Sequence, residues 1–262
     1  MNSARRAWIM ASTLLMTLVG TGVRAADDAA VSPLLDKPAG QLTLDEVQAL
    51  QQRVRDFAQL QRYRHENAAL PPVVATAPRV VFFGDSITEG WGRTGSSSFF
   101  PGKGYINRGI SGQTTAQMLL RFRQDVIALK PAVVVILAGT NDIAGNTGPA
   151  PQAMIEANLQ SMLELARLHG IAVILASVLP VSDYPWQPGI APADKVRSLN
   201  AALKRHAQRM GVQYLDYHAA LANAEGGLDR TLAEDGVHPT AEGYARMAPL
   251  VQRAIDVALH GR

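Results

Sequence analysis

The chain has 262 residues, of which 47% are hydrophobic and 18% charged, and this composition fits one globular domain and excludes a disordered or fibrous chain. It contains no cysteine, so disulfides, thiolate chemistry and cysteine–zinc sites are excluded. The formal net charge of +3 comes from three arginines among the first 25 residues, and the rest of the chain carries 22 basic against 22 acidic residues. That balance gives no support for a nucleic-acid or anionic-membrane partner.

The first 25 residues have the pattern of a secretory signal peptide. Arg5 and Arg6 precede an uncharged, apolar stretch over 7–23, and the segment 23–25 offers small residues at the two positions that a signal peptidase reads. We therefore expect cleavage near Ala25 and an exported protein, periplasmic or secreted, with no stable membrane insertion after cleavage. A retained membrane anchor is the alternative, although the apolar run is marginal for spanning a bilayer.

An N-terminal extension, residues 26–78, precedes the main domain. Thr43 and Glu46 have the spacing of a capping box, in which a threonine begins the helix and a glutamate lies three residues later. Apolar residues then follow at helical spacing: Val47, Leu50, Val54, Phe57, Leu60 and Tyr63. The pattern predicts one helix over about 43–66 that packs on the outside of the domain, and a projecting or dimer-forming helix is the alternative.

Expected strands and helices alternate from residue 79 to residue 262. The strands are expected at 79–83, 105–107, 132–138, 171–176 and 213–215, and the helices at about 114–129, 152–169, 193–210 and 240–259. The longer strand segments are unbroken apolar runs, which suits strands covered on both faces. The alternation predicts an α/β fold, a three-layer α/β/α sandwich around a five-stranded parallel sheet. Functional residues of such a sheet gather beyond the carboxyl ends of its strands, here in the loops 84–92, 108–114, 139–148, 177–192 and the stretch before 240.

A serine and a histidine lie in two of those loops. The first strand is followed by Gly84-Asp85-Ser86, and a serine hydroxyl becomes a nucleophile when a base takes its proton. His238 lies in a polar loop before the last helix with Asp235 three residues earlier, so one tight loop can carry both the base and its orienting acid. The alternatives are a strand that ends in a turn and a capping loop with an incidental histidine.

Two further loops offer hydrogen-bond donors for an oxyanion. Gly112 follows the second strand, and a glycine can bring its backbone N–H close to a substrate. Asn141 follows the third strand, and its side-chain amide can donate across the sheet. Glycine and asparagine are also ordinary turn residues, which is the alternative for each loop. The four strand ends together present the residue types that acyl transfer requires.

These four segments resemble the four blocks of the SGNH (GDSL) hydrolases, in the same order. The matching text is "GDS" with Ser86, "GISGQTT" with Gly112, "GTND" with Asn141 and "DGVHP" with Asp235 and His238. The resemblance spans roughly residues 79–245, and the wider text is similar to the bacterial branch that contains platelet-activating-factor-acetylhydrolase-like and lysophospholipase-like proteins. The α/β-hydrolase motif G-x-S-x-G is missing, because Ile87-Thr88 follow the serine.

The resemblance implies a flavodoxin-like hydrolase domain over 79–262 and a role for each residue. It implies that Ser86 is the nucleophile, His238 the base and Asp235 its orienting acid. It also implies an oxyanion hole made of the Ser86 and Gly112 backbone N–H groups and the Asn141 side chain. Gly109, the first glycine of the second block, is assigned to the turn. No cofactor is implied, and the sequence shows no metal-ligand motif and no phosphate-binding glycine loop.

The substrate is expected to be a small-molecule or glycan ester. Aromatic residues at the catalytic edge could stack on a sugar, line an acyl slot or simply pack their loops: Trp91, Phe99, Phe100, Tyr184 and Trp186. No long apolar lid interrupts the four motifs, which favours short acyl groups. We expect a serine esterase that removes O-acetyl groups from carbohydrates, with a lysophospholipase or short-chain thioesterase as the alternative. The non-enzymatic alternative is a glycan-binding module, and nothing in the sequence specifies an oligomeric state.

Overall fold

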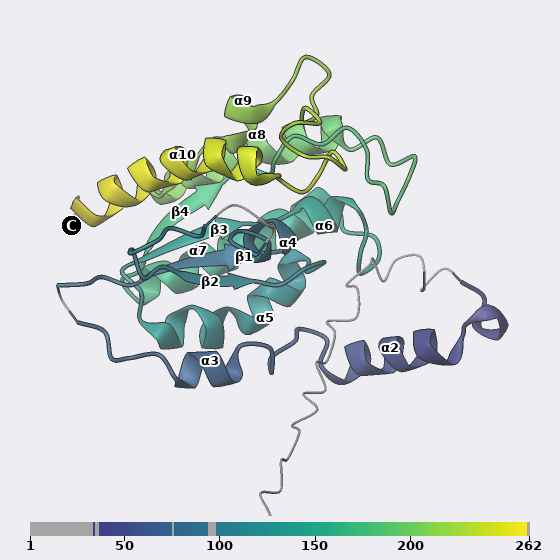
Figure 1. Ribbon diagram of the computed structural model, residues 1–262, viewed down its shortest axis with the longest axis horizontal. Coiled ribbons are helices and arrows are strands. Elements are labelled where there is room, and N and C mark those ends of the chain that lie inside the picture. Colours follow the sequence, from purple (N-terminus) through teal and green to yellow (C-terminus); the bar gives the residue numbers. More distant parts are fainter. Residues whose placement is uncertain (1–33, 35–36, 75, 94–97, 261–262) are drawn as a thin grey trace, which may run out of the picture.

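Five parallel strands form one sheet in the order β2-β1-β3-β4-β5 (Figure 1). The computed structural model describes residues 34, 37–74, 76–93 and 98–260. The strands are β1 (Val80–Gly84), β2 (Ile106–Gly109), β3 (Val133–Leu137), β4 (Ala172–Ala176) and β5 (Gln213–Leu215). All of them lie within two residues of the predicted bounds, so the predicted five-stranded parallel sheet is confirmed.

Helices cover both faces of this sheet. Val81 and Phe83 point into one core, which α5, α7 and α8 complete, whereas Val80 and Phe82 point into a second core under α9 and α10. The longer helices that cover the sheet are α5 (Thr115–Asp125), α7 (Gln152–Leu168), α8 (Ala193–Met210) and α10 (Ala241–His260). Alternate side chains of a strand face opposite sides of its sheet, so a strand that is apolar throughout is buried on both faces of the sheet. The predicted three-layer α/β/α sandwich is confirmed.

Short helices at strand ends were not predicted. α4 (Ser86–Glu89), α6 (Thr140–Ile143) and α9 (Tyr217–Leu221) each begin within three residues of the end of a strand. The remaining short elements are the 3-10 turns η1 (Ala39–Gln41) and η2 (Ile127–Leu129), the second of which replaces the last turn of the helix expected at 114–129. Segments of four or five residues are too short to show a helical repeat of apolar positions, so periodicity cannot detect them.

The single helix predicted over 43–66 is wrong. α2 (Leu44–Arg55) begins with the predicted capping box between Thr43 and Glu46, but the chain then turns and a separate helix, α3 (Arg64–Ala68), follows. The Asp56 carboxylate accepts hydrogen bonds from the backbone N–H groups of Leu60 and Gln61, at 2.7 and 3.1 Å. This local capping competes with helical hydrogen bonding and stops the helix.

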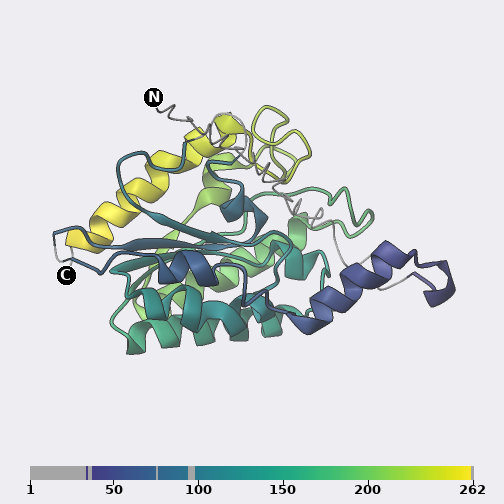
Figure 2. The same ribbon diagram turned by 60° about the horizontal axis from the view of Figure 1, so that its bottom comes forward.

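The two parts of the extension also differ in how they pack. α2 buries none of its residues and projects from the body of the molecule (Figures 1 and 2), so the expectation that it packs on the domain is wrong. The segment after α2 does pack on the domain. Glutamine side chains in α5 and just before it donate hydrogen bonds to the backbone carbonyls of this segment. These bonds run from Gln117 to Phe57, from Gln113 to Ala58 and from Gln124 to Leu60.

The predicted signal peptide lies outside the described residues. Within the part of the chain that the structure describes, no helix is both long enough and apolar enough to cross a membrane.

Candidate active site

Ser86 lies in the first turn of α4, directly beyond the carboxyl end of β1. The Asp85 carboxylate accepts a hydrogen bond from the Ile87 backbone N–H at 3.0 Å and so caps the helix. Gly84 allows α4 to approach the strand, because a Cβ atom there would lie 2.1 Å from the Thr88 hydroxyl and 2.8 Å from the Leu137 carbonyl oxygen. Strand, glycine and cap together fix the serine at this edge of the sheet.

His238 and Asp235 form a hydrogen-bonded line with the serine. The Ser86 Oγ lies 2.9 Å from the Nε2 atom of His238, and the Nδ1 atom of His238 lies 2.6 Å from the Oδ2 atom of Asp235. The other Asp235 oxygen accepts from the backbone N–H groups of Val237 and His238, at 2.9 and 2.8 Å. Each imidazole nitrogen therefore has one partner, which sets the ring between the carboxylate and the hydroxyl.

Partial burial and hydrogen bonding have opposite effects on the pKa of the Asp235 carboxyl. Burial raises its pKa, but the bonds from the His238 ring and from two backbone N–H groups outweigh burial, so the pKa of Asp235 lies below its usual value. The carboxylate is therefore ionised at neutral pH. It can hold the His238 Nδ1 proton and stabilise a positive charge on that ring.

Gly112 and Asn141 lie on either side of the serine. β1 is hydrogen-bonded to β2 on one side and to β3 on the other, Gly112 follows β2, and Asn141 lies in α6, which follows β3. Gly112 has a φ of 73°, a left-handed conformation that favours glycine. Asn141 is 2% exposed and donates from Nδ2 to the Gln113 carbonyl at 3.0 Å, so the two loops are in contact.

Gly109 does not serve a turn, so that assignment is corrected. It is the last residue of β2, and a Cβ atom there would lie 2.1 Å from the Glu89 backbone nitrogen and 2.7 Å from the Asp85 carbonyl oxygen. The glycine is needed because α4 passes close to it. Glu89, the last residue of α4, connects that helix to the loop after β2 and to the N-terminal extension. Its carboxylate accepts a hydrogen bond from the Ser111 N–H at 2.7 Å and pairs with Arg62 at 2.9 Å.

Most of the aromatic residues considered for substrate contact are packed inside the protein. Trp91 is 5% exposed and packs in one core with Phe82, Phe99 and Phe100. Tyr184 is fully buried, and its hydroxyl contacts the Thr140 side chain and backbone carbonyl.

Trp186 differs, because it is partly exposed and its ring centroid lies 5.9 Å from that of His238. Of the five aromatics singled out in the sequence, Trp186 is the one in contact with a residue of the hydrogen-bonded line.

Two further carboxyl groups are buried beside the site. Burial raises the pKa of Asp85 to about 7 and that of Asp142 to about 6. Asp142 accepts hydrogen bonds from the backbone N–H and the hydroxyl of Thr115, which tie α6 to the start of α5. Among the described residues, no group of three or more histidines and carboxylates is arranged to hold a metal ion.

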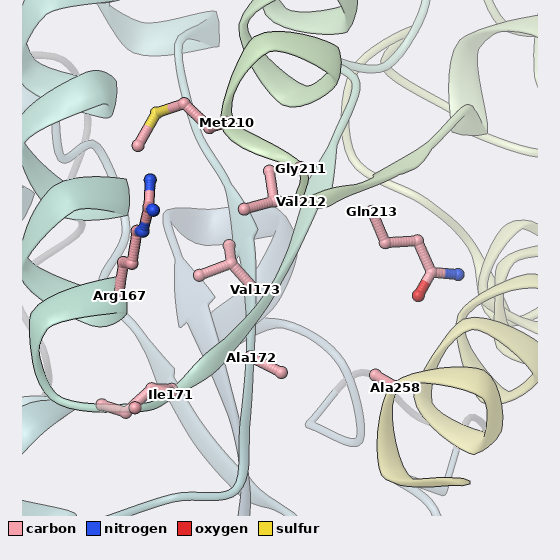
Figure 3. Close-up of a pocket in the computed structure, with 10 residues that line it drawn as sticks. Arg167, Ile171, Ala172, Val173, Met210, Gly211, Val212, Gln213 and Ala258 are labelled. Carbon is pink, nitrogen blue, oxygen red and sulfur yellow. The ribbon is translucent and has the colours of Figure 1, made fainter. Parts of the chain in front are cut away.

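A cavity of about 620 Å³ lies at the opposite edge of the sheet, where β4 and β5 begin (Figure 3). The ends of α7 and α8 contribute Arg167 and Met210 to its lining, and Gln213 contributes from the start of β5. Its lining includes none of the predicted site residues, so it is separate from the serine-containing edge.

Comparisons with known proteins match the chain to one family. A family model described as the GDSL-like lipase/acylhydrolase family covers residues 82–246. Among solved structures, a GDSL-like lipase from Bacteroides thetaiotaomicron is 48% identical with a TM-score of 0.74, over 77% of this chain and 99% of that one. These findings agree with the resemblance drawn from the four motifs.

Several curated relatives are esterases. Esterase TesA of Pseudomonas aeruginosa is 31% identical over 185 residues, which cover 66% of this chain and 85% of TesA. An acetylxylan esterase of Geobacillus stearothermophilus is 27% identical over 213 residues, which cover 70% of this chain and 95% of that protein. The aligned regions cover between 33% and 95% of the curated relatives' own lengths. The share of 33% is that of a lipoprotein of Bacillus subtilis.

Proposed function

Because the chain belongs to the GDSL-like lipase/acylhydrolase family, a family of carboxylic ester hydrolases, we propose that it is an exported serine esterase that removes short acyl groups, acetyl above all, from carbohydrate esters. One observation carries the proposal. Ser86, His238 and Asp235 form a continuous hydrogen-bonded line, with separations of 2.9 and 2.6 Å, at the carboxyl edge of the sheet. Nucleophile, base and orienting acid in that order are the arrangement that serine acyl transfer requires.

In the proposed mechanism, Ser86 attacks the ester carbonyl carbon while His238 takes the hydroxyl proton at Nε2. Asp235 holds the Nδ1 proton and stabilises the imidazolium that forms. His238 then returns the proton to the leaving alcohol oxygen, and the carbon–oxygen bond of the ester breaks to give an acyl-enzyme. A water molecule, deprotonated by the same imidazole, attacks this acyl group and releases the carboxylic acid and the free serine.

The tetrahedral oxyanion is held by donors from both sides of β1. The Ser86 and Gly112 backbone N–H groups and the Asn141 side-chain amide are the proposed donors. Their placement after neighbouring strands, together with the buried contact of Asn141 with the Gly112 loop, supports this assignment. Donors held by the fold need no reorganisation when the charge develops, which is the source of their effect on kcat.

Two observations favour a sugar ester as substrate. Two curated relatives are acetylxylan esterases, which align with 71% and 70% of the chain. The partly exposed ring of Trp186 lies beside His238, the residue that protonates the leaving alcohol. An aromatic ring at that position offers a face on which a sugar leaving group can stack, since such rings combine an apolar body with a polar edge.

The test is a series of p-nitrophenyl esters from two to twelve carbons, together with acetate release from acetylated xylan. We expect kcat/KM to be highest for acetyl and propionyl esters and to fall at eight carbons and beyond. A site that offered a dry wall to the acyl tail would instead gain about 0.8 kcal/mol for each methylene group. A maximum at eight carbons or more would overturn the short-acyl assignment in favour of a lysophospholipase or thioesterase.

Export is proposed from the leader sequence. Arg5, Arg6 and the apolar stretch that follows support a cleaved signal peptide, and the residues from 26 onward then form the mature protein. N-terminal sequencing of the exported protein is expected to begin near Ala26. Exported material that begins at Met1 would contradict the proposed cleavage.

A further inference from the structure

Asn146 is a buried asparagine that contacts both loops of the proposed oxyanion hole. It lies three residues after the end of α6 and is 4% exposed. Its Nδ2 atom donates to the Gly112 carbonyl at 3.2 Å and to the Asn141 Oδ1 atom at 2.9 Å. Its Oδ1 atom accepts from the Trp186 indole N–H at 3.2 Å. The nitrogen and the oxygen of this side chain are therefore both used, and its partners lie in α6 and in the loops that follow β2 and β4.

The direction of these bonds follows from the indole N–H at one end and from the Gly112 and Gln113 carbonyls, which can only accept. A tryptophan N–H can only donate, so the atom of Asn146 that faces Trp186 must be the oxygen. The Asn146 nitrogen then faces Asn141 and can only donate, so the atom of Asn141 that faces it must also be an oxygen. This leaves the Asn141 Nδ2 group on the other side, where one of its two hydrogens goes to the Gln113 carbonyl and the second is available.

We propose that Asn146 and Trp186 are positioning residues that fix which way the Asn141 amide points. This rests on the proposed function, in which the second Nδ2 hydrogen of Asn141 donates to the oxyanion. A side-chain amide can rotate by half a turn with little change in shape, and the rotated form would present an oxygen to the developing negative charge. The donor-only indole, together with the Gly112 and Gln113 carbonyls, which can only accept, excludes that form.

Asn146 also restrains the second donor. Its bond to the Gly112 carbonyl holds a residue whose φ of 73° sets the direction of its own N–H group. One buried amide thus contacts the loops that follow β2 and β3 at the same time. We expect its removal to affect the chemical step more than the binding of substrate, because an oxyanion donor acts mainly when charge develops.

The experiment is a double-mutant cycle on kcat and KM with p-nitrophenyl acetate. Asn141→Ala is expected to lower kcat by about 10² to 10³. Asn146→Ala alone is expected to lower kcat by about tenfold with KM little changed, which is the size of one lost hydrogen bond. In the Asn141→Ala background the same change should cost only about threefold or less, because the effect that passes through Asn141 is already lost and only the bond to the Gly112 carbonyl remains.

Trp186→Phe is the second variant, because it keeps a ring beside His238 and removes only the indole N–H. It is expected to lower kcat about threefold to tenfold in the wild-type background, with KM little changed, and to have no further effect in Asn146→Ala. Asn200→Ala is the matched control, since Asn200 is 7% exposed and its amide bonds both the N–H and the carbonyl of Val178, which is not one of the proposed site residues. It should lower the melting temperature and leave kcat unchanged.

The outcomes separate this proposal from the proposed function. Asn146→Ala with wild-type kcat, or with the same loss in both backgrounds, would overturn the positioning role alone. A change confined to KM in Trp186→Phe would reassign the indole to substrate binding and would also overturn it. If Asn141→Ala itself left kcat unchanged, the oxyanion hole and the positioning role that depends on it would both be wrong.

Discussion

The two sides of the candidate site are built in different ways. On the acid–base side, Asp235 and His238 are three residues apart in one loop, and their side chains are 42% and 41% exposed. On the oxyanion side, Asn141 and Asn146 are 2% and 4% exposed, and they bond each other and residues of the loops that follow two other strands, β2 and β4. The first side is a local structure at the surface, and the second depends on the whole sheet being folded.

The difference has a physical reason. The base must exchange protons with substrate and water, so its ring has to be open to them, and a carboxylate three residues away can orient it without help from other elements. An oxyanion donor is most effective when it is fixed and shielded from water, because an exposed donor would reorient and be screened. Each side can therefore be tested by variants that leave the other in place.

The largest effect is expected from the residues that carry the reaction on the acid–base side. Ser86→Ala and His238→Ala should each lower kcat by about 10⁶, and the double variant should be little worse, because nucleophile and base act as one unit. Steady-state kinetics with p-nitrophenyl acetate measures this. Substantial activity in either single variant, or losses that multiply in the double, would show that the assignment of nucleophile and base is wrong.

The next largest effect is expected at the acid. Asp235→Asn keeps the size of the side chain but favours the wrong His238 tautomer, and kcat should fall by about 10⁴. Glu234→Gln is the matched control, because it removes an exposed carboxylate from the same loop and should leave kcat within about twofold, as for an exposed charge. Equal losses in the two variants would mean that the loop needs negative charge in general and no orienting carboxylate at 235.

A smaller effect is expected on the oxyanion side. Asn141→Ala should lower kcat by about 10² to 10³, equivalent to about 2.7–4 kcal/mol, while KM changes little. The variant should also unfold at a lower temperature, because it removes the Asn141 acceptor of the buried Asn146 amide and the donor to the Gln113 carbonyl. If only KM changed, Asn141 would be a substrate-binding residue and the comparison between the two sides would fail.

Sequence reasoning succeeded where the determining contacts are local. The five strands were predicted to within two residues because apolar runs are read from the chain directly. The D-x-x-H spacing of Asp235 and His238 was sufficient to predict a contact that the structure places at 2.6 Å. The capping box of Thr43 and Glu46 was predicted for the same reason.

The rest depends on contacts between distant segments. Asn146 was missed, although it follows Asn141 by five residues, because its partners Gly112 and Trp186 are more than 30 residues away in either direction. The break after α2 was missed because Asp56 stops the helix within a continuous helical pattern of apolar residues. Gly109 was misassigned because the close approach of α4 is visible only in three dimensions.

The smallest effects concern the pH dependence of stability, which has opposite signs for the buried Asp85 and the exposed Asp235. Burial raises the pKa of Asp85 to about 7, so the folded protein binds this proton more tightly than the unfolded chain does. The stabilisation that Asp85 contributes is therefore fully present below its pKa in the unfolded chain, and it is lost as the pH rises towards 7. The melting temperature of the wild type relative to Asp85→Asn should fall between pH 4 and pH 7.

The contribution of Asp235 to stability depends on pH in the opposite direction. Its pKa is lowered in the folded protein, so its contribution is present above the unfolded pKa and is lost as pH falls through the lowered value. The melting temperature of the wild type relative to Asp235→Asn should therefore decrease on acidification below about pH 4, with a small amplitude because the group is well exposed. The same sign for both carboxyls would contradict the contrast between a buried and an exposed carboxyl.

The central claim is that Ser86 is a nucleophile activated by His238, and covalent labelling tests it most directly. A fluorophosphonate ester would be incubated with the mature enzyme, and the labelled peptide identified by mass spectrometry while residual esterase activity is followed. We predict one phosphonyl group on Ser86, loss of activity in step with labelling, and labelling slowed by several orders of magnitude in His238→Ala. Full inactivation with the label on another residue, or labelling of Ser86 at an unchanged rate in His238→Ala, would contradict the account.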